Sequence, residues 1–195
     1  MMIKKLNRGV LLIIAALVLA ACGGTTGDDE QEKNQAPTEE TSEQSSDMDD
    51  MEHSDSGEIP DDLEAASNPT YEVGSQARIT TDHMKGMEGA EATIVGAYDT
   101  RAYIISYTPS TGGEKVENHK WVVQEEIENS GDSEIPAGEE VTVQADHMEG
   151  MEGVTATIDS SEETTVYMID YESTTDGKAV KNHKWVTEEE LTTNK

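Results

Sequence analysis

Cysteine is almost absent from this chain of 195 residues, in which Cys22 is the only one. A single thiol excludes a disulfide within the chain and a metal site built from several thiolates. Positive charge is also scarce: 13 lysines and arginines stand against 42 aspartates and glutamates, which gives a formal net charge of −29. Such a chain repels nucleic-acid phosphates, so we expect no nucleic-acid partner. An acidic surface attracts cations, although it also keeps an exposed protein soluble.

Long apolar runs are missing as well. The apolar stretch at residues 10–19 is half the length of ~20 residues that a membrane-spanning helix needs. It follows a basic N-terminal region and ends in Leu-Ala-Ala-Cys at Cys22, which predicts a signal peptide over residues 1–21. The ending resembles the lipobox of bacterial lipoproteins. That resemblance implies cleavage before Cys22 and a lipid on its sulfur, which would anchor the protein to the outer face of the cell membrane.

Apolar side chains are nearly absent from the segment that follows. Residues 23–58 hold 13 acidic residues and one lysine. A segment of this composition cannot bury enough apolar surface to offset the entropy of ordering it. We therefore expect residues 22–58 to form a lipidated, disordered, acidic stalk.

The rest of the chain is a tandem repeat. DHMKGMEG at 82–89 returns as DHMEGMEG at 146–153, and NHKWV at 118–122 returns at 182–186, both 64 residues later. Between 74–129 and 138–193 there are 25 identities in 56 positions, and these two short blocks supply 12 of them. Four of the five histidines and both tryptophans lie in the blocks, which indicates a site with demanding chemistry. We expect a first repeat at 59–130 and a second at 131–195.

Each repeat alternates as β-strands do. Tyr103, Ile105 and Tyr107 share one face and are matched 64 residues later by Tyr, Ile and Tyr, so this face is expected to point inward. The pattern predicts strands at 76–81, 91–98, 101–108 and 119–123, a brief helical turn at 125–128, and equivalents of all of these in the second repeat. The predicted fold is all-β, with two tandem small SH3-like barrels after the stalk.

The first conserved block carries metal-binding chemistry. His83, Met84 and Met87 offer one imidazole and two thioethers within five residues, and His147, Met148 and Met151 repeat them. Thioether sulfur is soft and neutral, and outside the reducing cytosol such sites select Cu(I) over Zn(II), Mg(II) or Ca(II). The two blocks therefore predict two copper sites.

The second block could complete each site. On a strand, His119 and Trp121 project to one face, as do His183 and Trp185. The change of Val123 to Thr187 hints that this face is not deeply buried. If it meets the His/Met turn, each site gains a second histidine and an indole that can cover a monovalent cation.

Each candidate ligand also has a simpler interpretation. Methionine usually fills apolar cores, but six of the seven methionines after residue 21 form Met-x-x-Met pairs. One pair, Met48 and Met51, lies in the stalk beside His53, where we expect no core. His119 and His183 could be ordinary strand histidines, and Trp121 and Trp185 part of an apolar layer. The motif aspartates Asp82 and Asp146 could orient a histidine or cap a turn.

The pattern HMxGMxGAxATI, YxxxYxPxxGG and NHKWVxxEE from Gly74 onward resembles the YdhK-type domain of Gram-positive surface lipoproteins, a family that includes the copper-binding lipoprotein CopL. The resemblance implies extracellular copper binding and copper tolerance, with the histidines and methionines of the two DHMxGM blocks as carriers. A delivery partner such as a copper-export ATPase, or contact with the cell wall, does not follow from the sequence.

Two other function classes were weighed against copper binding. The sequence contains no nucleophile elbow, phosphate loop or cysteine nucleophile, so we expect no enzyme. The alternative is a non-catalytic module that binds cell wall or protein, because SH3-like domains often bind through exposed aromatic side chains.

Overall fold

The computed structural model describes residues 54–193, and every strand pair in it is antiparallel. The predictions for the signal peptide, Cys22, most of the stalk, Met48, Met51 and His53 therefore lie outside the described residues. The elements are strands β1 (Gln76–Ile79), β2 (Glu91–Tyr107), β3 (Val116–Val123), β4 (Glu140–Thr142), β5 (Thr155–Glu172), β6 (Ala179–Thr187) and β7 (Leu191–Thr192), with the single-turn 3₁₀ helices η2 (Gln124–Glu126) and η3 (Glu188–Glu190). The predicted all-β class is confirmed.

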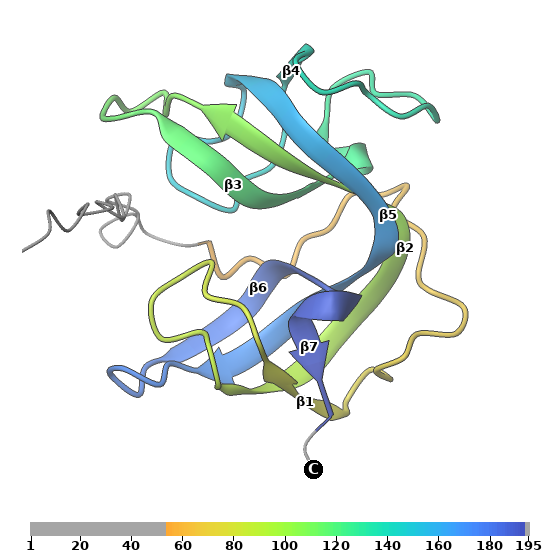
Figure 1. Ribbon diagram of the computed structural model, residues 1–195, viewed down its shortest axis with the longest axis vertical. Coiled ribbons are helices and arrows are strands. Elements are labelled where there is room, and N and C mark those ends of the chain that lie inside the picture. Colours follow the sequence, from red (N-terminus) through yellow and green to blue (C-terminus); the bar gives the residue numbers. More distant parts are fainter. Residues whose placement is uncertain (1–53, 194–195) are drawn as a thin grey trace, which may run out of the picture. The chain divides into compact units, whose positions relative to one another are not determined.

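Strands β2 and β5 organise the fold. They pair along almost their whole length, from Ala92 opposite Tyr171 to Tyr107 opposite Ala156. Figure 1 shows them side by side through the upper half, where β3 and β4 lie, and the lower half, where β1, β6 and β7 lie. The sequence predicts two short strands at 91–98 and 101–108, but the structure joins them into one strand of 17 residues. The second repeat does the same in β5, which has 18 residues.

Because the long strands pass from one half to the other, the molecule has two separate cores. One core, which we name lobe 1, contains β1, the start of β2, the end of β5, β6 and β7: Tyr71, Ala77, Ile79, Met87, Ala90, Ala92, Ile94, Ala97, Tyr167, Ile169, Tyr171, Val186 and Leu191. The other, lobe 2, contains the end of β2, β3, β4 and the start of β5: Tyr103, Ile105, Tyr107, Val116, Val122, Ile127, Val143, Ala145, Met148, Met151, Val154, Ala156 and Ile158.

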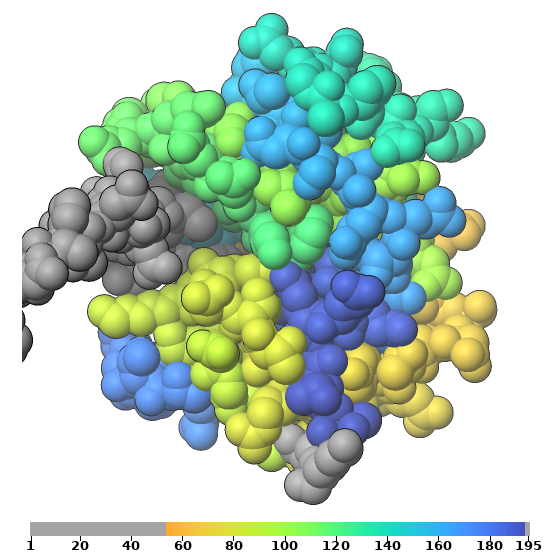
Figure 2. All heavy atoms as spheres, viewed as in Figure 1, coloured from red at the N-terminus to blue at the C-terminus, as the bar shows by residue number. Residues whose placement is uncertain are grey.

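Each lobe is therefore built from both sequence repeats. Lobe 1 joins the first half of the first repeat to the last half of the second, and lobe 2 joins the remaining halves. In Figure 2 the segment near residues 80–90, yellow-green, packs beside the C-terminal residues in dark blue, consistent with the pairing of β1 with β7. This differs from the expectation of one SH3-like barrel per repeat. The reason is that β2 and β5 hydrogen-bond to each other and not back onto their own repeats.

The inward face predicted for the long strands is confirmed, since Tyr103, Ile105 and Tyr107 are buried, as are Tyr167, Ile169 and Tyr171. A third buried cluster lies where the lobes meet and contains Leu63, Ala102, Trp121, Val123, Val166, Met168 and Trp185. The hint that the His/Trp face is poorly buried is wrong, because this junction covers it. Within residues 54–193 no helix is long and apolar enough to cross a membrane.

Two histidine, glutamate and tryptophan centres

A buried carboxylate brings the two conserved blocks together. His83, in the turn between β1 and β2, places Nε2 2.7 Å from Oε1 of Glu190, the last residue of η3. Trp121 of β3 donates its indole N–H to Oε2 of the same carboxylate over 2.8 Å. We call His83, Trp121 and Glu190 the first centre. Sequence reasoning placed His83 and Trp121 together and missed the carboxylate that joins them.

Local backbone structure fixes the position of Glu190. The residue closes η3, and its Oε2 accepts the backbone N–H of Thr187 at 3.0 Å, which caps the turn. Burial alone would raise the pKa of Glu190, but the hydrogen bond and charge of His83, with the donors from Thr187 and Trp121, lower this pKa to about 2. Glu190 is therefore ionised at neutral pH and acts only as an acceptor.

An ionised carboxylate determines which ring nitrogen of His83 carries the proton. Because Glu190 can only accept, Nε2 of His83 must be the donor, and in the neutral ring Nδ1 then presents its lone pair. Nδ1 is buried and, among the residues that the structure describes, has no hydrogen-bond partner. The ring is thus oriented by one nitrogen and offers the other.

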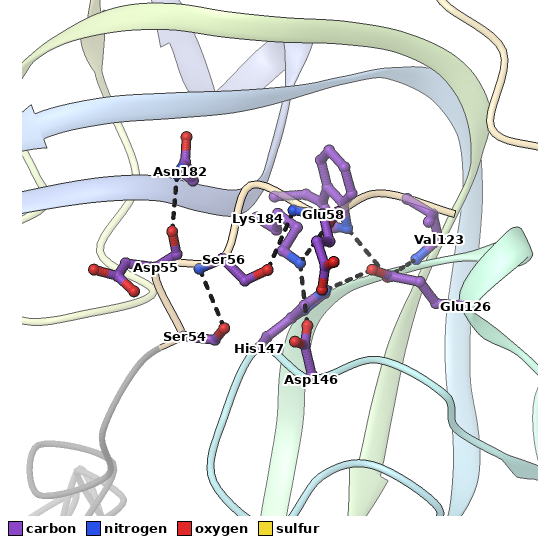
Figure 3. A network of polar contacts seen from close by, with 11 residues as sticks. Ser54, Asp55, Ser56, Glu58, Val123, Glu126, Asp146, His147, Asn182 and Lys184 are labelled. Carbon is purple, nitrogen blue, oxygen red and sulfur yellow. Dashed lines mark hydrogen bonds and ion pairs between the residues drawn. The ribbon is translucent and has the colours of Figure 1, made fainter. Parts of the chain in front are cut away.

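The second centre repeats this arrangement 64 residues later (Figure 3). His147 places Nε2 2.7 Å from Oε1 of Glu126, and Trp185 donates its indole N–H to Oε2 over 3.1 Å. Glu126 closes η2 and accepts the backbone N–H of Val123 at 3.0 Å, as Glu190 accepts that of Thr187. Nδ1 of His147 is also buried without a hydrogen-bond partner in the described part of the chain.

Both centres cross the boundary between repeats. The first takes its histidine and tryptophan from the first repeat and Glu190 from the second, whereas the second takes Glu126 from the first repeat and the other two residues from the second. Within each centre the histidine and carboxylate share a lobe, and the tryptophan reaches in from the junction between lobes. Each centre therefore forms only when both repeats are folded together.

The remaining histidines lie next to the centres. The rings of His119 and His147 are 6.3 Å apart between centroids, and Tyr107 lies 5.8 Å from His119 on the other side. His183 lies 6.0 Å from Tyr171 in the equivalent position of lobe 1. Burial raises the pKa of Tyr107 and of Tyr171 to about 12, so both phenols keep their protons and are poor metal ligands. The expected meeting of the two blocks therefore occurs between His119 of one repeat and His147 of the other.

The motif methionines divide into two groups. Met87 and Met151 are fully buried in the cores of lobes 1 and 2, as the core-filling interpretation expects, and Met84 packs against the edge of lobe 1. Met148 lines an open cavity of about 510 Å³ beside Asp146 and Glu149. Within residues 54–193 no three side chains of His, Cys, Asp or Glu lie close enough to hold a metal ion. A metal held there would need ligands of another type, and metal binding by the methionines stays a prediction.

The orienting group for each ring is a glutamate, whereas the sequence suggested an aspartate. Asp146 pairs with Lys184 at 3.1 Å. Glu126 and Glu190 have a sequence signal, because the Glu-Glu pair that ends NHKWVxxEE is retained in both repeats while its neighbours change from Gln124 to Glu188 and from Ile127 to Leu191.

Comparison with known proteins gives a consistent assignment. Residues 73–124 and 137–188 each match the family described as "Protein of unknown function (DUF1541)". The chain is 57% identical over 154 residues to the "Uncharacterized protein YdhK" of Bacillus subtilis (strain 168), which covers 79% of this chain and 75% of that protein. A crystal structure of YdhK superposes with a TM-score of 0.71 at 59% identity and covers 73% of this chain and 97% of that one. A solution structure of the YdhK C-terminal domain has a TM-score of 0.60 at 62% identity and covers 63% of this chain and 93% of that one.

Proposed function

This chain belongs to the DUF1541 family, and we propose that it is a non-catalytic copper-binding lipoprotein, anchored at the outer face of the cell membrane by a lipid on Cys22. Copper is its cargo, held preferentially as Cu(I). By sequestering or buffering copper outside the cell, the protein contributes to copper tolerance.

The buried Nδ1 atoms of His83 and His147 carry this proposal. A buried polar atom without a partner destabilises a fold and calls for an explanation, and an absent metal ion is one of the common ones. The carboxylates support the same interpretation, since metal-binding histidines usually donate their second N–H to a carboxylate that fixes the ring. The buried imidazole nitrogens therefore fit a metal ion.

The surrounding donors select copper among the metals. Each histidine stands in a turn with two thioethers, and soft sulfur ligands favour Cu(I). In the first centre His83 would bind through Nδ1 with Met84 or Met87, and in the second His147 would bind with Met148 or Met151. His119 and His183 are additional nitrogen donors, and each indole offers a face to a monovalent cation. The cargo remains in its oxidation state throughout, so no redox partner is required.

Competition with a chromophoric Cu(I) chelator under anaerobic conditions tests the proposal. We expect about two Cu(I) per chain, one for each centre. Replacing both carboxylates, Glu190→Gln with Glu126→Gln, should lower affinity by roughly 10–100-fold, the usual effect of losing the group that orients a metal ligand. Met87→Leu with Met151→Leu keeps the core volume and should weaken binding if the thioethers are ligands.

Met168→Leu is the matched control for the methionine variants, because Met168 is buried at the junction of the lobes and lies outside the Met-x-x-Met pairs. Its Cu(I) affinity should equal that of the parent. A parent that ignores Cu(I) and sediments with purified cell wall would instead support the wall-binding alternative. Cys22→Ser should remove the protein from the membrane fraction, and unchanged membrane partition in this variant would contradict the lipid anchor.

A further inference from the structure

One short segment distinguishes the two centres. Residues 54–58, which we call the strap, run between the turn that carries His147 and strand β6 (Figure 3). The Ser54 N–H donates to the His147 carbonyl at 3.0 Å, Asn182 Nδ2 donates to the Asp55 carbonyl at 2.8 Å, and Lys184 Nζ donates to the Glu58 carbonyl at 2.9 Å. All three contacts use the backbone of the strap, so they hold its path and not particular side chains.

The strap was expected to be the end of the disordered stalk, and its contacts make it part of the folded surface. It lies over the second centre only, because the chain has a single segment that precedes the first repeat. The exposed fractions of the side chains follow this difference: His147 and Glu126 are 1% and 5% exposed, whereas His83 and Glu190 are 7% and 12% exposed.

Two equivalent lysines show how the strap changes the surroundings. Lys120 at the first centre is 38% exposed, bonds Glu190 at 3.4 Å and lies 5.1 Å from the centroid of the Trp121 ring. Lys184 at the second centre is 3% exposed and lies 3.1 Å from Asp146. Lys184 therefore connects the strap, β6 and the His147 turn.

We propose that the strap controls access to the second centre, so that the two centres exchange their cargo at different rates. This proposal rests on the proposed copper binding. The first centre takes up and releases Cu(I) quickly, and the second does so only when the strap detaches. Loss of one strap hydrogen bond to Lys184, which is charged, should raise the population of the detached state by roughly tenfold.

A metal-free measurement tests the strap itself. Hydrogen exchange of the Ser54 amide, followed by NMR on the full chain, should be slow in the parent and roughly tenfold faster in Lys184→Met. Asn182→Asp should also speed it, because aspartate tolerates the same backbone conformation, φ 49°, and lacks the donor. The equivalent substitutions at the first centre, Lys120→Met and Asn118→Asp, should leave it unchanged. Equal exchange in all five proteins would overturn the proposal.

A Cu(I) measurement tests the consequence. The protein has two tryptophans, one for each centre, so their two indole N–H signals report the centres separately. On addition of less than one equivalent of Cu(I), the Trp121 signal should respond first and the Trp185 signal about tenfold more slowly or later, a lag that Lys184→Met abolishes and Lys120→Met preserves. Simultaneous responses in the parent would overturn the proposal. No response of either indole, together with slow exchange at Ser54, would refute copper binding and leave the strap established.

Discussion

The first and second centres contain the same residue types at the same spacing, yet they differ in their surroundings. In the first centre the nearby lysine, Lys120, bonds the central carboxylate and lies over the indole. In the second centre the equivalent Lys184 turns away to Asp146 and to the carbonyl of Glu58. Since the conserved blocks are nearly identical, this difference comes from the strap, a segment that has no counterpart before the second repeat. Identical local sequence therefore makes equal centres only where the surrounding chain is also equal.

Exposure is the second difference, and it matters because both centres depend on a buried carboxylate. Glu126 and Glu190 each accept an indole N–H, a backbone N–H and a histidine N–H, so three buried donors lose their acceptor when either carboxylate is removed. The less exposed centre has less water available as a substitute partner. The second centre should therefore be the more sensitive of the two to loss of its carboxylate.

Removal of the carboxylates should give the largest effect. Glu126→Ala should lower the free energy of unfolding by roughly 3–5 kcal/mol, the range for breaking a buried charged pair, and Glu190→Ala by less, roughly 2 kcal/mol. Urea denaturation of the metal-free protein measures both. Glu128→Ala, which alters an exposed side chain two residues from Glu126, is the control and should change stability by less than about 0.5 kcal/mol. Equal losses at Glu126 and Glu190 would show that the centres do not differ in burial.

Acid should weaken the first centre in a defined pH range. The pKa of Glu190 is about 2 in the folded protein, below its ordinary value of 4.5. Its stabilising contribution is therefore fully present above about pH 4.5 and is lost as the pH falls toward about 2, and the shift corresponds to roughly 3 kcal/mol.

Urea denaturation between pH 7 and pH 3 provides the measurement for this prediction. The parent should lose more stability on acidification than Glu190→Gln, which has no carboxylate to protonate at the first centre. Glu128→Gln should follow the parent. Identical pH profiles for the parent and Glu190→Gln would mean that the contacts of Glu190 with His83 and Trp121 do not stabilise its ionised form.

The smallest effect should come from two buried phenols at which the lobes are equivalent. The hydroxyl groups of Tyr107 and Tyr171 have no hydrogen-bond partner within residues 54–193. Tyr107→Phe and Tyr171→Phe should therefore change the free energy of unfolding by less than about 0.5 kcal/mol, or raise it slightly. Tyr103→Phe is the contrast, since its hydroxyl contacts Gln124 and the Ile135 N–H, and should cost about 1 kcal/mol. Different effects at Tyr107 and Tyr171 would show that the lobes differ outside their centres.

Much of the fold was accessible from local pattern. Alternation placed Tyr103, Ile105 and Tyr107 on the buried face, and the repeat spacing transferred the prediction to the second copy. Alternation failed at the His/Trp strand, where β3 shifts register against β2 on both sides of the pair His119 and Ile105. Such bulges re-aim side chains, so simple strand periodicity could not place His119 and Trp121.

The sequence by itself determined that this protein is an all-β tandem repeat with a histidine and methionine chemistry in each copy, because strand periodicity and ligand type are properties of a few neighbouring residues. Only the tertiary structure decided that the two repeats share both cores, that Glu190 reaches His83 and Glu126 reaches His147, and that the strap lies over one centre. These are contacts between residues more than 20 positions apart, and the pairing of β2 with β5 sets them. Two nearly identical repeats carry no local signal that says whether a strand pairs within its own copy or with the other.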